Sequence, residues 1–74
     1  MLTLPQKVGR AIRRLRERRD ESQEDFADRV GLHRTAMSAL ERGRTDPRLS
    51  SLERIARGLG VRVSELLREA ESEG

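Results

Sequence analysis

The residues best suited to chemistry stand together in the segment His33, Arg34 and Thr35, shortly after a glycine. A guanidinium can donate two parallel hydrogen bonds to guanine O6 and N7, and hydroxyl groups can bond bases or phosphates. His33 is the only histidine and the chain has no cysteine, so the segment does not have the ligands of a zinc site. We therefore interpret these side chains as groups that recognise a polyanion, with His33 capping a helix or contacting phosphate.

Two short helices must position this segment. Ser22 is a good N-cap for a helix over 23–30, with acidic residues in its positive first turn and Gly31 as its stop. Apolar spacing predicts a second helix over about 33–42, which Gly43 ends. Two helices joined by so short a turn form a helix-turn-helix, whose second helix fits a major groove about 12 Å wide.

The rest of the chain also has helical periodicity, so the predicted fold is all-α with five helices in a single domain over 1–74. Further helices are expected over 5–19 and 49–58. The core covers about 6–67, and residues 71–74 are expected to form a frayed acidic tail. Four apolar residues mark the last helix: Val63, Leu66, Leu67 and Ala70.

Charge and composition limit the classes of function. The net charge is +3, and 15 of the 16 basic residues are arginine. Residues 1–19 carry +6 and residues 20–33 carry −4, a banding that suits one polyanion-facing side. No apolar run approaches the roughly 20 residues that span a bilayer, so we expect a cytoplasmic protein without a membrane partner. No nucleophile with a base and no metal site is recognisable, so we expect no enzyme, no cofactor and no small-molecule ligand.

The segment SQEDFADRVGLHRTAMSALERGRTDP resembles the helix-turn-helix of the Xre-like family, the group of the Cro and lambda repressors. The similarity extends over about residues 6–67. The combination GLHRT, Ser38 and ERG further resembles the controller proteins of restriction-modification systems.

The resemblance implies roles for individual residues. The residues expected to face bases are Arg34, Thr35, Ser38 and Ala39. Those expected to contact DNA phosphates are Gln23, Arg42, Arg44 and Arg48, and we add His33 from its place before the helix. Arg16 and Glu41 match a pair that ties the first helix to the third. Relatives commonly pair through the last helix, where Val63, Leu66 and Leu67 are the expected homodimer contacts.

The predicted function is therefore sequence-specific binding of double-stranded DNA. A homodimer would bind a palindromic or nearly palindromic operator and regulate transcription, as a restriction-modification controller or a phage-type repressor. The alternatives are an antitoxin and a protein-interaction module that docks a protein partner with the same fold. Four residues around the groove-facing helix argue against a pure interaction module: Arg34, Thr35, Arg42 and Arg44.

Overall fold

The computed structural model describes residues 1–73, which form five α-helices and no strand. The helices are α1 (Leu4–Arg18), α2 (Gln23–Val30), α3 (Arg34–Glu41), α4 (Leu49–Leu59) and α5 (Val63–Glu71). The all-α prediction and all five predicted helices are confirmed, with small shifts at their ends. Within residues 1–73, no helix has the length and hydropathy that crossing a membrane requires.

The first helix begins earlier than predicted because Thr3 caps it. The Thr3 hydroxyl accepts a hydrogen bond from the backbone N–H of Gln6 (3.3 Å), and the Gln6 side chain accepts one from the backbone N–H of Thr3 (2.8 Å). This capping box satisfies two backbone donors that an uncapped helix leaves free. The α1 start at Leu4 follows from this contact.

The turn between α2 and α3 depends on Gly31. Its φ of 75° lies in the left-handed region. Glycine adopts this conformation without steric strain, whereas a residue with a Cβ atom is strained there. The backbone N–H of Leu32 then donates to the carbonyl of Ala27 (2.8 Å) and closes the end of α2. His33 follows as the N-cap residue of α3, although its side chain makes no capping hydrogen bond.

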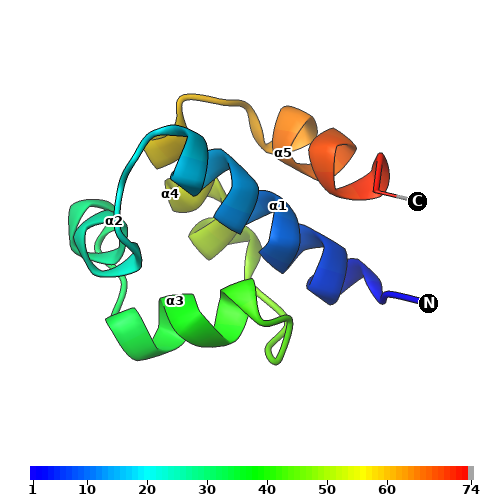
Figure 1. Cartoon of the computed structure of the whole chain (residues 1–74), viewed down its shortest axis with the longest axis horizontal. Helices are drawn as coiled ribbons and strands as arrows, with labels where there is room; N and C mark the ends of the chain where they lie inside the picture. Colours follow the sequence, from blue (N-terminus) through cyan, green and yellow to red (C-terminus); the bar gives the residue numbers. More distant parts are fainter. Residues whose placement is uncertain (74) are drawn as a thin grey trace.

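Helix α1 lies between α3 and α5, which pack on opposite sides of it (Figure 1). The backbones of α1 and α3 approach so closely that a Cβ atom at Gly9 would overlap the carbonyl oxygen of Leu40 and lie 2.8 Å from that of Glu41. Side chains from all five helices fill the core, and the largest that are fully buried are Phe26, Ile12, Met37, Ile55 and Leu66.

The structure corrects one prediction about the C-terminal part. Leu66 is 0% exposed because it points into the core, so its expected place in a dimer interface is wrong. Val63 and Leu67 are partly buried at the edge of the core. In the tail predicted to be frayed, Glu71 is the last residue of α5, and the Glu73 carboxylate pairs with Arg10 and Arg14 of α1. Gly74, the last residue of that predicted tail, lies outside the described residues.

Candidate nucleic-acid interface

An open hollow of about 500 Å³ lies between the start of α2, the exposed face of α3 and the loop that follows. It is lined by Gln23, Arg34, Thr35, Ser38, Ala39, Arg42 and Arg44. All four residues expected to face bases are among them, together with three of the five expected phosphate contacts. The fold thus gathers on one surface most of the residues that the resemblance implies for DNA contact.

Helix α3 presents this face because its opposite face is anchored in the core. Met37 is 0% exposed and Leu40 is 7% exposed. Arg34 and Thr35 open the helix and are exposed, and Ser38 lies one turn further on the same side. Side chains at i and i+4 lie above one another on a helix, so Arg34 and Ser38 form one ridge along the hollow.

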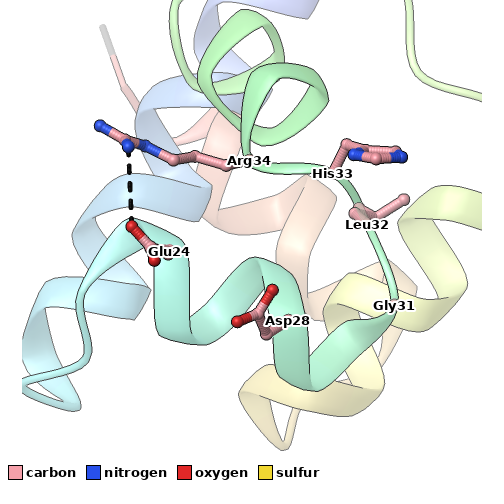
Figure 2. Close-up of a pocket in the computed structure, with 6 residues that line it drawn as sticks. All are labelled: Glu24, Asp28, Gly31, Leu32, His33 and Arg34. Carbon is pink, nitrogen blue, oxygen red and sulfur yellow. Dashed lines mark ion pairs between the residues drawn. The ribbon is translucent and has the colours of Figure 1, made fainter.

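The arginines beyond α3 are free to meet an anion. Arg42 and Arg44 are exposed, and neither has a hydrogen-bond or ion-pair partner for its side chain among residues 1–73. Arg48 is exposed at the N-cap of α4 and does not line the hollow. His33 is also exposed and lines a neighbouring hollow with Glu24 and Asp28 (Figure 2). The structure therefore does not bring these last two phosphate candidates into the main group.

Gln23 stands at the start of α2, where a side-chain partner holds its amide. Its Nε2 donates a hydrogen bond to Glu41 Oε1 at 3.0 Å. A side-chain amide has two N–H donors, so one remains for another acceptor at the rim of the hollow.

Glu41 also binds Arg16, as predicted. Two hydrogen bonds join the forked guanidinium to the carboxylate, from Arg16 Nε to Oε2 (2.7 Å) and from Nη2 to Oε1 (2.9 Å). The side chains are 9% and 4% exposed. These hydrogen bonds raise the pKa of Arg16 above its ordinary value, although burial alone would lower it. The pair fixes the end of α3 against α1.

One contact of this region, an ion pair to Arg34, was not predicted from the sequence. Glu24, in the first turn of α2, places Oε2 3.6 Å from Nη1 of Arg34 (Figure 2). The sequence shows only an acid where the helix dipole favours one. Because the turn after α2 determines which of its acids faces α3, this ion pair required the three-dimensional structure.

A comparison with protein families supports the predicted resemblance. The helix-turn-helix family model matches residues 12–66, which include α2, α3 and α4 entirely. The chain belongs to this helix-turn-helix family. Regulators of the helix-turn-helix family bind DNA, and this chain is a DNA-binding transcriptional regulator.

Two relatives of this chain differ in the share of their own length that the match covers. Control protein C.MunI of Mycoplasma sp is 41% identical over 68 residues, which are 90% of this chain and 92% of the relative. The immunity repressor protein of Bacillus phage phi105 is 37% identical, over 84% of this chain and 43% of the repressor. The phage repressor thus contains additional sequence that the match does not reach.

Solved structures of other regulators share this fold. The restriction-modification controller protein C.AhdI from Aeromonas hydrophila is 32% identical, with a TM-score of 0.81 over 84% of this chain and 94% of that one. The clp gene regulator ClgR from C. glutamicum is 27% identical, with a TM-score of 0.91 over 96% and 91% of the two chains.

Proposed function

We propose that this regulator reads a nearly palindromic operator as a homodimer, with α3 in the major groove. The observation that carries the proposal is the single hollow lined by seven candidate contact residues. A helix with exposed polar side chains on its outer face and unpaired arginines beyond its end can read bases while the contacts to the DNA backbone hold it in place.

Within this class, we propose the role of a restriction-modification controller. The support is the similarity to control protein C.MunI, at 41% identity over 68 residues, and to controller C.AhdI, at 32% identity with a TM-score of 0.81. The resemblance of the GLHRT segment to controller proteins points the same way.

Base reading is assigned to Arg34, with Thr35, Ser38 and Ala39 beside it on α3. Phosphate contacts are assigned to Arg42 and Arg44, whose side chains are exposed and unpaired in the described chain, and more peripherally to Arg48 and His33. Gln23 would give its remaining N–H to a phosphate while Glu41 holds the amide in place. This division gives each group a different effect on specificity.

The dimer is proposed to form through the partly buried residues Val63 and Leu67 of α5. They lie one helical turn apart, so they share a side of the helix. Helix α5 packs on the opposite side of α1 from α3 (Figure 1). A contact made there leaves α3 uncovered in both subunits.

Binding to selected DNA tests the division of roles. Wild-type protein is first used to select duplexes from a random library, and affinities are then measured on a selected duplex, its single-base variants and random DNA. Arg34→Ala should weaken binding of the selected duplex and abolish preference at one base pair per half-site, a loss of about 1–3 kcal/mol.

Arg44→Ala should weaken selected and random DNA about equally and reduce the salt slope by about one unit per lost contact in each subunit. If Arg34→Ala lowers the affinity for all duplexes by one common factor, Arg34 is a backbone contact and the assignment is wrong.

Sedimentation of the chain and of Leu67→Glu tests the dimer. We expect a dimer at tens of micromolar for the wild type and a monomer with unchanged helical circular dichroism for the variant. A monomeric wild type would contradict the dimer without affecting the assignment of α3.

A further inference from the structure

Arg34 differs from the other arginines of the hollow in having a carboxylate beside it. Figure 2 shows Glu24 at the start of α2 facing Arg34 at the start of α3, with 3.6 Å between Oε2 and Nη1. Both side chains remain well exposed, at 63% and 70%. Arg42 and Arg44, which line the same hollow, have no acidic partner among residues 1–73. The only arginine proposed to read a base is thus the only one in this hollow that is restrained.

We infer that Glu24 is a positioning residue that sets the base specificity of Arg34. The inference rests on the proposed function, because it concerns how the same side chain reads DNA. A guanidinium has five N–H donors in a rigid plane. Glu24 lies at Nη1, which leaves other N–H groups of the fork to meet guanine O6 and N7 together. The carboxylate would hold one side of the plane while the base binds another.

Positioning matters because Arg34 is a long side chain at a free helix end. An unrestrained arginine loses much rotamer freedom when it binds, and a partner that holds it beforehand reduces that loss. The ion pair is weak in water at this exposure. It becomes stronger when DNA excludes water from around it, since the local dielectric falls.

Glu24 also excludes the wrong contact. A phosphate that approached Arg34 in place of guanine would come close to the carboxylate and be repelled. Guanine O6 and N7 carry no net charge, so they meet no such penalty. The same side chain therefore favours a base and disfavours the DNA backbone, which are the two conditions for discrimination.

Asp28 provides a matched control. It lies one turn further along α2 and lines the neighbouring hollow together with Glu24 and Arg34, but it has no ion pair with Arg34. Figure 2 shows a dashed line from Arg34 to Glu24 and none to Asp28. Asp28→Asn and Glu24→Gln each remove one negative charge from this side of α2, so general repulsion of DNA changes similarly in both.

The experiment compares these two variants on the selected duplex, on its single-base variants and on random DNA. Glu24→Gln should weaken the selected duplex and strengthen random DNA, so that the ratio of the two affinities falls about threefold to tenfold. Among the single-base variants, the loss of preference should be confined to the base pair that Arg34 reads. Asp28→Asn should strengthen binding to both duplexes by a similar factor and leave the ratio unchanged.

A second arm combines Glu24→Gln with Arg34→Ala, where the ratio should not fall beyond that of Arg34→Ala alone. Unchanged melting temperatures and helical circular dichroism show that the variants are folded. If Glu24→Gln shifts both duplexes together as Asp28→Asn does, or still lowers the ratio without Arg34, the inference is wrong. A wild type that selects no duplex contradicts the proposed function instead, so the two failures are distinct.

Discussion

Helix α1 is tied to α3 and to α5 by the same chemistry, arginine with glutamate, but in different surroundings. Towards α3 there is one ion pair, Arg16 with Glu41, whose side chains are 9% and 4% exposed. Towards α5 there is an open network in which three arginines meet two glutamates at 2.6–3.5 Å: Arg10, Arg14, Arg18, Glu69 and Glu73. The arginines of this network are 34–64% exposed.

The two contacts differ in how strictly they fix the packing of a helix against α1. A buried pair that loses one partner leaves a charge without compensation, so its geometry is nearly obligatory. Exposed pairs exchange readily with water and are screened by salt. The side of α1 that carries the proposed reading helix is therefore the rigid one. The α5 side is held mainly by Leu66 and Ala70, with the network adding little.

The largest expected effect is that of Glu41→Leu. Arg16 would keep its bond to the carbonyl of Glu21 (2.8 Å) but lose its only carboxylate hydrogen bonds. We expect the free energy of unfolding to fall by about 3 kcal/mol. Urea unfolding followed by circular dichroism at fixed protein concentration measures it.

The double variant Arg16→Met with Glu41→Leu should lose less than Glu41→Leu alone, because no charge is then stranded. A double-mutant cycle with a coupling energy near zero would show that the buried pair is no different from the exposed network.

The next effect concerns the close contact of α1 with α3 at Gly9. Gly9→Ala places a methyl group against the backbone carbonyl of Leu40, which cannot rotate away, so the helices must separate. We expect a net loss of about 2 kcal/mol in the free energy of unfolding, after the gain in helix propensity.

Gly58→Ala is the matched comparison, since its new methyl group would meet side-chain atoms of Val30 and Phe26 and no backbone carbonyl. That variant should lose less stability than Gly9→Ala, because a side chain can shift without separating two helix backbones. Equal losses in the two variants would contradict the rigid backbone contact proposed for the α3 side.

The smallest effect is expected on the α5 side. Glu73 accepts from Arg14 at 2.8 Å, and this hydrogen bond raises the pKa of Arg14. Arg14 remains about one third exposed, however, so Glu73→Gln should cost only about 0.5 kcal/mol at low salt. Thermal melts at about 0.02 and 1 M salt should show the difference between the proteins disappearing at high salt. A loss that persists at high salt would place this network in the same class as Arg16 and Glu41.

Helix positions were predictable because they depend on local signals. The N-cap Ser22, the stop at Gly31 and the apolar spacing all act within a few residues, and the helices follow them. The pair Arg16–Glu41 was found through family resemblance, since nothing in the spacing connects residues 25 apart. The residues that line the hollow could be predicted because they lie on one face of α3 and next to it.

The failures concern contacts between distant segments. Periodicity shows that Val63, Leu66 and Leu67 share an apolar side, but not which of them meets α1. The prediction therefore placed Leu66 in the dimer interface, whereas its side chain is buried in the core. Glu73 is 59 residues from Arg14, so a terminal acid looked free until the fold brought the two together. Glu24 and Arg34 belong to different helices, and the angle of the turn determines their meeting.

The position of α1 between α3 and α5 also has a mechanical consequence. In a dimer joined through α5, one helix about 22 Å long would connect each reading helix to the subunit contact. The spacing between the two reading helices would then be a fixed dimension, and the protein would act as a ruler on DNA. One base pair inserted between half-sites moves them apart by about 3.4 Å and rotates them by about one tenth of a turn. A rod packed on both sides cannot follow that change, so only one of the two half-sites could be read at a time.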